Sequence, residues 1–182
     1  MKFIFDFDDV LFYNTKQLKE RMYSILEREG VSRGDVEAYY KTTDGVRFWL
    51  KDMLTHFSLS QDLYKEVLEE NKNFVNKDLV EIIKKLGKEN CYIVTHGVES
   101  WQKDKIESAG LEPLFTKIFI VSENKKNVVE EICKKHKDEK VVFVDDKVKY
   151  FEELDMSKCP NLKTILFDEH GLEKLKREIE LK

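Results

Sequence analysis

The feature that most constrains the fold is a set of five short apolar runs, most of which alternate with segments of helical composition. Continuous apolar runs of this length are typical of strands buried on both faces, and such strands occur mainly in parallel sheets covered by helices. The runs lie at residues 2–5, 91–94, 117–121, 140–144 and 163–167. The helical segments lie at residues 98–110, 126–137, 147–154 and 171–182. The sequence therefore predicts an α/β fold with three layers, in which helices cover both faces of a parallel sheet.

A block of about 75 residues separates the first run from the second, and its apolar residues have helical rather than strand spacing. These residues are Leu18, Met22, Ile25, Leu26, Val46, Phe48, Trp49, Leu50, Met53, Leu54, Leu63, Val67 and Leu68. The last helix of the block, at residues 78–87, is expected to pack on the sheet, with Asp78 capping its start and Gly87 its end. We therefore expect a core domain of residues 1–14 and 77–182 and a helical insertion of residues 15–76.

Polar residues follow three of the apolar runs, at the points where strands are expected to end. Asp6 and Asp8 follow the first run, and their side chains lie on one side of an extended chain. Thr95 and the amides next to it follow the second run, while Asp145 and Asp146 follow the fourth. In open parallel sheets, ligands bind outside the carboxyl ends of the strands. The sequence thus predicts that these groups gather at one edge of the sheet.

Each of these groups alone also fits an ordinary structural role. The two acidic pairs fit turns or helix caps, and Thr95 also fits a cap. Together, however, four carboxylates at one edge repel one another and raise one another's pKa unless a cation neutralises them. A site with only oxygen ligands suits a hard cation, and Mg²⁺ is the cation we expect.

The charge balance and the cysteines limit the other classes of function. Acidic residues number 36 against 32 basic ones, giving a net charge of -4, which does not favour binding to nucleic acid or to an anionic membrane. The apolar runs are too short to span a bilayer, and the N-terminal segment meets acids too early for a signal peptide. Three widely separated cysteines, Cys91, Cys133 and Cys159, fit reduced thiols. We expect a soluble, cytoplasmic protein.

Four stretches of the chain resemble the motifs of the haloacid dehalogenase (HAD) superfamily, in the order in which that family has them. FDFDDVL resembles motif I, a strand followed by DxDx(T/V), with Val10 at the last position. Thr95 in YIVTHG resembles motif II, a lysine in SENKKNVVEEI resembles motif III, and VVFVDD resembles motif IV. The resemblance covers residues 3–146 and implies a Rossmann-like core. It also makes the helical insertion after motif I what this family calls a C1 cap.

The resemblance implies a Mg²⁺-dependent phosphatase that acts through an aspartyl-phosphate on a small phosphorylated metabolite. Asp6 would be the nucleophile, and Asp8 would be the general acid and then the general base. The metal would be held by Asp6, by the backbone carbonyl of Asp8 and by Asp146, with Asp145 acting through water. We expect a monomer or a homodimer with no nucleic-acid partner.

The phosphate group would be bound by residues of motifs II and III. Thr95 would donate its hydroxyl, the backbone amides at His96 and Gly97 would assist, and the motif III lysine would balance the negative charge. For that lysine we prefer Lys126 to Lys125, because Lys126 directly precedes Asn127 at the expected helix start, where the family often has Lys-Pro.

Other functions are weighed against the phosphatase. A dehalogenase does not use an aspartate two residues after its nucleophile, so Asp8 favours phosphoryl transfer. Response-regulator receivers gather similar groups around Mg²⁺ but in another order along the chain. Neither GxxxxGK(S/T) nor a GxGxxG after a strand is present, which argues against a P-loop ATPase and a dinucleotide enzyme. A HAD phosphotransferase or phosphomutase, and a non-catalytic HAD domain used for binding, remain the alternatives.

Overall fold

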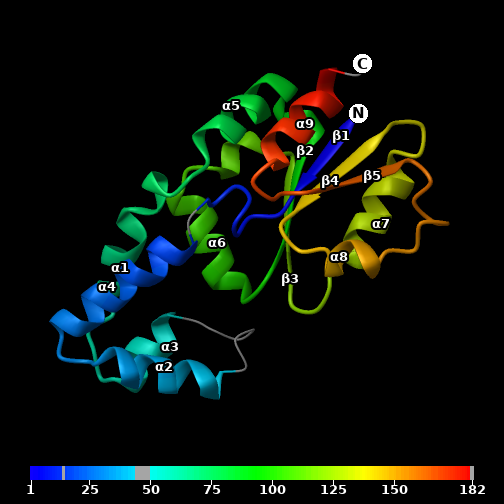
Figure 1. Ribbon diagram of the computed structural model, residues 1–182. Coiled ribbons are helices and arrows are strands. Elements are labelled where there is room, and N and C mark those ends of the chain that lie inside the picture. Colours follow the sequence, from blue (N-terminus) through cyan, green and yellow to red (C-terminus); the bar gives the residue numbers. More distant parts are fainter. Residues whose placement is uncertain (14, 44–49, 181–182) are drawn as a thin grey trace.

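The computed structural model describes residues 1–13, 15–43 and 50–180. Five strands form one parallel sheet in the order β3-β2-β1-β4-β5 (Figure 1). The strands are β1 (Lys2–Phe5), β2 (Cys91–His96), β3 (Lys117–Val121), β4 (Val141–Asp145) and β5 (Leu162–Leu166). Each strand coincides with one of the predicted apolar runs, so the predicted parallel α/β sheet is confirmed.

β1 is the central strand, and its side chains divide the core into two apolar clusters. Phe3 and Phe5 are buried in one cluster, and Ile4 is buried in the other. Because successive side chains of a strand point to opposite faces, one cluster lies on each face of the sheet. The first cluster includes residues of α5 (Lys77–Leu86), α6 (Glu99–Ser108) and α9 (Gly171–Glu180). The second includes residues of α7 (Lys126–Lys135) and α8 (Lys149–Glu152). The predicted three-layer arrangement is therefore confirmed.

The ends of α5 show one correct and one wrong prediction about helix caps. Asn76, not Asp78, is the N-cap residue, because the side chain of Asn76 accepts a hydrogen bond from the Leu79 N–H. Asp78 lies inside the first turn, where a carboxylate interacts favourably with the helix dipole. Gly87 ends the helix as predicted, with φ +85°, a conformation that favours glycine.

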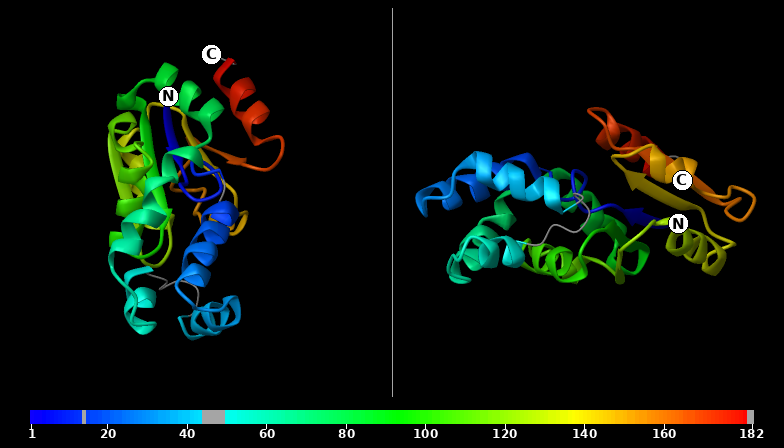
Figure 2. Two further views of the ribbon diagram at one scale, coloured as in Figure 1. Left: turned by 90° about the vertical axis from the view of Figure 1, so that its left-hand side faces the viewer. Right: turned by 90° about the horizontal axis from the view of Figure 1, so that it is seen from below.

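Between β1 and α5 the chain forms helices that lie beyond the carboxyl ends of the strands, at the opposite end of the molecule from the two termini (Figures 1 and 2). These helices are α1 (Thr15–Arg28), α2 (Arg33–Thr42), α3 (Leu50–His56) and α4 (Asp62–Glu69). Single 3-10 turns occur at η1 (Asn71–Asn73), η2 (Lys88–Asn90) and η3 (Glu112–Leu114). Most of the apolar residues predicted to form helices here are buried or partly buried, whereas Val46, Phe48 and Trp49 lie outside the described residues.

The two connections of the helical insertion lie side by side. The Tyr13 N–H donates to the Phe74 carbonyl (2.8 Å), and the Asn76 N–H donates to the Leu11 carbonyl (2.9 Å). Phe12 and Val75 form an antiparallel bridge between these two hydrogen bonds. Where the chain leaves the core and where it returns thus form one paired junction. The division into residues 1–14 and 77–182 against residues 15–76 stays a prediction.

A helix that spans a lipid bilayer needs about 20 consecutive, mostly apolar residues. Within residues 1–13, 15–43 and 50–180, none of the helices combines the length and the apolar character needed to span a membrane.

Candidate active site

The carboxyl end of β1 leads into a tight loop that carries the first acids. The Asp6 N–H donates to the Val144 carbonyl (2.9 Å), which extends the pairing of β1 with β4. The chain then turns back, because the Phe12 N–H donates to the Phe7 carbonyl (2.8 Å) and Asp9 adopts φ +58°. The loop keeps the Asp6 carboxylate buried at the sheet edge and brings the Asp8 carboxylate to α6.

Three of the four predicted metal-binding aspartates bring carboxylate oxygens together. One oxygen each from Asp6, Asp145 and Asp146 lies within 4.8 Å of the others. Asp145 already accepts two hydrogen bonds, from the Lys125 ammonium and from the Lys147 N–H. Asp146 Oδ1 is buried and has no hydrogen-bond partner among the described residues. An oxygen-only cluster with an unsatisfied buried carboxylate oxygen fits a hard divalent cation such as Mg²⁺.

The lysine at this cluster is Lys125, so the preference for Lys126 is corrected. The Lys125 ammonium lies 2.8 Å from Asp6 Oδ1 and 2.6 Å from Asp145 Oδ2, and the Lys125 side chain is only 1% exposed. The Lys126 ammonium lies 3.8 Å from Glu130, one turn further along α7. The physical reason is the helix start: Lys126 is the first residue of α7 and points along its surface, whereas Lys125 precedes the helix. Side chains one residue apart at such a junction face different directions.

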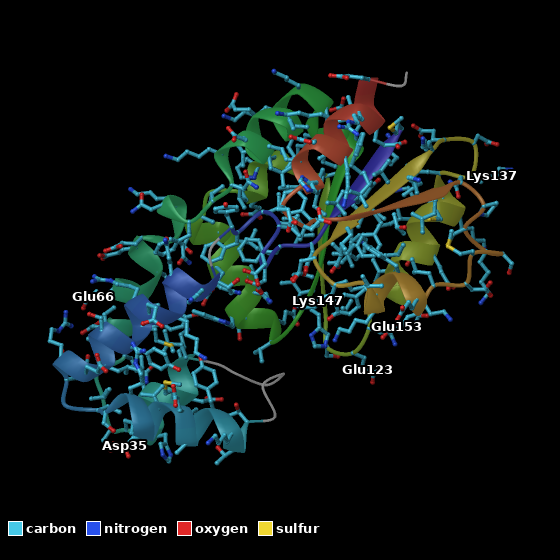
Figure 3. The ribbon with its side chains drawn as sticks, viewed as in Figure 1. Asp35, Glu66, Glu123, Lys137, Lys147 and Glu153 are labelled. Atoms are coloured by element: carbon cyan, nitrogen blue, oxygen red, sulfur yellow. The ribbon has the colours of Figure 1, made fainter. Side chains whose placement is uncertain are left out.

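Burial is the largest effect on the pKa values of Asp6 and Asp145. Burial, opposed by Lys125 and assisted by Asp145, raises the pKa of Asp6 to about 7. Burial also raises the pKa of Asp145, although Lys125 opposes this effect. The buried Lys125 ammonium pairs with Asp6 and Asp145, and the partly exposed Lys147 ammonium lies 3.6 Å from Asp146 Oδ2. A bound cation would further favour the charged forms of the three carboxylates. Lys147, next to Asp146, lies between α6 and α8 at the sheet edge that faces the helical insertion (Figure 3).

The end of β2 supplies a hydroxyl group next to β1. Thr95 is 1% exposed, and its Oγ1 has no hydrogen-bond partner in the described ranges. Because buried hydroxyl groups are normally paired, Thr95 is available to a ligand at the sheet edge. Burial is the largest effect on His96 and lowers its pKa.

Gly97 differs from its prediction as a phosphate-binding residue. Its N–H donates to the Val121 carbonyl (3.0 Å), so this amide is occupied by the neighbouring strand. The φ of Gly97 is +152°, and a Cβ atom there would lie 2.8 Å from Gln102 Nε2. Gly97 therefore allows the close approach of Gln102.

The carboxylate of Asp8 lies outside the three-aspartate cluster and is held by α6. Lys105 Nζ lies 2.6 Å from Asp8 Oδ1, and Gln102 Nε2 donates to Asp8 Oδ2 (2.8 Å). Burial alone would raise the pKa of Asp8, but Lys105 and Gln102 outweigh it and hold the pKa below its ordinary value. The side chain of Asp8 thus has partners of its own, and metal binding by its backbone carbonyl stays a prediction.

Lys105 and Gln102 are site residues that were not predicted from the sequence. The spacing of Lys105 could have indicated it. Trp101, Lys105 and Ala109 are four residues apart and lie on one face of a helix, and Trp101 and Ala109 are apolar. A lysine in an apolar stripe needs a buried partner. Which carboxylate supplies that partner depends on the tertiary structure.

A parallel sheet with acidic side chains at its carboxyl edge fits an α/β protein with a cation site, and comparisons with known proteins identify the family. The sequence model of the haloacid dehalogenase-like hydrolases matches residues 3–149. Since this match covers most of the chain, the protein belongs to that family of hydrolases, and the resemblance found in the sequence is confirmed. A comparison with curated proteins gave no match.

Solved structures share this fold at low sequence identity. The magnesium-bound HAD hydrolase YfnB from Bacillus subtilis is 18% identical, with a TM-score of 0.59 over 98% of this chain and 97% of its own. A haloacid dehalogenase-like hydrolase from Burkholderia xenovorans LB400 is 17% identical, with a TM-score of 0.68 over 94% and 89%. A protein named as a β-phosphoglucomutase from Thermotoga maritima is 16% identical, with a TM-score of 0.58 over 97% and 99%. At these identities the likeness establishes the fold alone.

Proposed function

We propose that this HAD hydrolase is a Mg²⁺-dependent phosphomonoesterase that acts on a small phosphorylated metabolite through an aspartyl-phosphate on Asp6. The observation that carries the proposal is the buried Asp6 carboxylate, which shares the Lys125 ammonium with Asp145 and adjoins Asp146. The buried Thr95 hydroxyl on the adjacent strand, which has no partner within the described parts of the chain, supports it. The cluster thus combines a nucleophile, positive charge and a free donor, which phosphoryl transfer requires.

In the first step, a carboxylate oxygen of Asp6 attacks the phosphorus atom, and the bond between phosphorus and the ester oxygen breaks. Asp8 gives its proton to that oxygen, and the alcohol leaves. Because Lys105 and Gln102 favour the charged form of Asp8, this step proceeds through the fraction of molecules in which Asp8 carries a proton. In the second step, Asp8 takes a proton from a water molecule that attacks the phosphorus, and the bond between phosphorus and the Asp6 oxygen breaks. Inorganic phosphate leaves, and both carboxyl groups return to their starting states.

The chain's own residues orient the reacting groups. The Phe7 N–H (2.7 Å) and the Lys125 ammonium both donate to Asp6 Oδ1, which fixes the nucleophile. Thr95 Oγ1 and the His96 backbone amide bind phosphate oxygens in this proposal, and Lys125 balances their charge. Gly97 contributes no amide, since its N–H is occupied.

Asp6, Asp146 and the Asp8 backbone carbonyl would hold Mg²⁺, and Asp145 would act mainly by holding Lys125. When bound, the ion screens the repulsion between the anionic nucleophile and the phosphate. Burial, with a smaller contribution from Asp145, raises the pKa of Asp6, and a bound cation would favour the charged form that the nucleophile needs.

The helical insertion and the α/β core have separate roles in this proposal. Residues 15–76 form a C1 cap that selects the substrate, and residues 1–14 and 77–182 form the catalytic core. The protein acts in the cytoplasm as a monomer or homodimer, without nucleic acid.

Hydrolysis of p-nitrophenyl phosphate by the purified protein tests the proposal. We expect turnover with Mg²⁺, none in EDTA, and none for Asp6→Asn, which retains the shape of the side chain but not the nucleophile. A folded protein that shows no turnover under any of these conditions would support the alternative of a HAD domain used only for binding.

A phosphomutase or other phosphotransferase is the second candidate, favoured by the fold shared with the protein named as a β-phosphoglucomutase. It would use the same nucleophile and differ only in what accepts the phosphoryl group. Measurement of free phosphate against phosphorylated product distinguishes the two.

A further inference from the structure

Lys105 on α6 is a buried charged residue that the proposed mechanism does not use. It is 3% exposed, and its ammonium lies 5.1 Å from the centre of the Phe7 ring. The rings of Phe12 and Trp101 lie 5.8 and 5.5 Å from the same nitrogen. Aromatic faces attract a cation but do not replace its lost hydration. Lys105 therefore requires an anionic partner among these rings.

That partner is Asp8, whose two carboxylate oxygens are both held by residues of α6. Oδ1 accepts from Lys105 (2.6 Å), and Oδ2 accepts from Gln102 Nε2 (2.8 Å). Gln102 Nε2 also donates to the His96 carbonyl at the end of β2 (2.8 Å), which fixes the amide in turn. A carboxylate that is bonded through both oxygens cannot rotate freely. Because each oxygen has two lone pairs, each can still accept one further hydrogen bond.

Stability alone does not explain the buried ion pair between Lys105 and Asp8. Replacing such pairs by apolar residues of similar volume is often neutral or stabilising, because burying two charges costs about as much as their attraction returns. An apolar residue would complete the stripe formed by Trp101 and Ala109 equally well.

Lys105 also borders the region where the helical insertion meets the core. It lines a cavity of about 270 Å³ together with residues of the insertion, among them Thr15, Lys19, Met22 and Tyr40. Lys105 therefore contacts Asp8 and also lines a cavity that residues of the insertion share.

We propose that Lys105 and Gln102 are positioning residues that fix the orientation of the Asp8 carboxyl group for proton transfer to the leaving group. This inference rests on the proposed phosphatase function. Removing Lys105 has two opposite effects on proton transfer. More molecules carry a proton on Asp8, because the Lys105 ammonium favours its charged form, but the carboxyl group rotates between several orientations and few molecules hold it where the ester oxygen needs the proton. We expect the loss of orientation to be the larger effect.

Two esters of similar shape separate this role from a merely structural one. The leaving group of p-nitrophenyl phosphate is stable as an anion and needs little protonation, whereas that of phenyl phosphate is more basic and depends on the acid. The ratio of kcat/KM for the two esters reports proton donation, since kcat/KM covers only the steps up to the departure of the alcohol. We expect Lys105→Met to lower kcat/KM for phenyl phosphate at least about tenfold more than for p-nitrophenyl phosphate.

Matched variants control the experiment. Lys103→Met lies on the same helix, where Lys103 has a 64% exposed side chain, and should leave the ratio unchanged. Lys105→Arg keeps the charge and should restore part of the ratio. If Lys105→Met does not fold, Gln102→Met serves in its place, because it removes only the hydrogen bond to Asp8 Oδ2 and the one to His96.

The outcomes separate this inference from the proposed function. An equal loss on both esters, or no loss on either, would overturn the role of Lys105 while the phosphatase function stands. A wild type that hydrolyses neither ester would overturn the function and this inference together.

Discussion

Replacing Lys125 with methionine removes the one ammonium that bridges Asp6 and Asp145. Methionine keeps most of the side-chain length, so the change isolates the charge. The carboxylates of Asp6 and Asp145 are buried, and one oxygen of each lies within 4.8 Å of the other. Removing one partner of a buried ion pair costs about 3–5 kcal/mol, because the other partner stays buried without compensation. For a domain of this size, that corresponds to a fall of roughly 6–20 °C in Tm.

Mg²⁺ should reduce this loss. Without Lys125 the cluster is more negative and attracts a cation more strongly, so Mg²⁺ should raise the Tm of the variant by more than it raises that of the wild type. The activity should nevertheless fall by at least about a hundredfold, since the phosphate and nucleophile lose a preorganised charge.

Thermal unfolding with EDTA and with Mg²⁺ measures both effects, and Lys126→Met is the matched control. Lys126 lies next to Lys125 but is 35% exposed at its side chain and faces Glu130. Its replacement should change stability by no more than about 1 kcal/mol and leave the activity unchanged. If Lys126→Met were the more damaging of the two, or if Lys125→Met were neutral in EDTA, the electrostatic account of the cluster would be wrong.

Two further substitutions test single groups of the site. Thr95→Val replaces a buried, unpaired hydroxyl by a methyl group, so stability should stay the same or rise, while kcat/KM should fall by roughly 10–100-fold through the lost hydrogen bond to phosphate; an unchanged kcat/KM would exclude Thr95 from phosphate binding. The pKa of Asp6 is raised from 3.8 to about 7. The folded state therefore binds the carboxyl proton of Asp6 more tightly than the unfolded chain does. As a result, the free energy of unfolding of the metal-free protein falls as the pH rises through this range. Asp6→Asn removes this effect and should be more stable than the wild type in EDTA at about pH 8, by up to about 4 kcal/mol, since each pKa unit corresponds to about 1.4 kcal/mol. Denaturant unfolding should show that difference shrinking toward about pH 4, and a variant that is less stable at about pH 8 would contradict the reasoning.

The fold could be predicted from the sequence because burial on both faces leaves a plain pattern. Phe3, Ile4 and Phe5 are all fully buried, and such runs recur only where parallel strands lie between helices. The same topology brings the ends of β1 and β4 together, which is why Asp6, Asp145 and Asp146 could be predicted to meet.

The wrong predictions concern details that the backbone decides locally. Lys125 and Lys126 have the same chemistry and differ only in whether they precede or begin α7. Asn76 and Asp78 are both good cap residues, and the actual start of the helix selects Asn76. The amide of Gly97 is occupied because β3 extends far enough to accept its hydrogen bond.

Detection of a phosphoryl group on Asp6 tests the central claim most directly. In Asp8→Asn the step that releases p-nitrophenolate needs little acid assistance, but hydrolysis of the intermediate loses its base, so the phosphorylated enzyme should accumulate. Mixing this variant with p-nitrophenyl phosphate and Mg²⁺ should release a burst of p-nitrophenolate equal to the enzyme concentration. Acid quenching and peptide mass spectrometry should then locate one phosphoryl group on Asp6. Turnover with no burst and no modified Asp6, or with the phosphoryl group on another residue, would contradict the account.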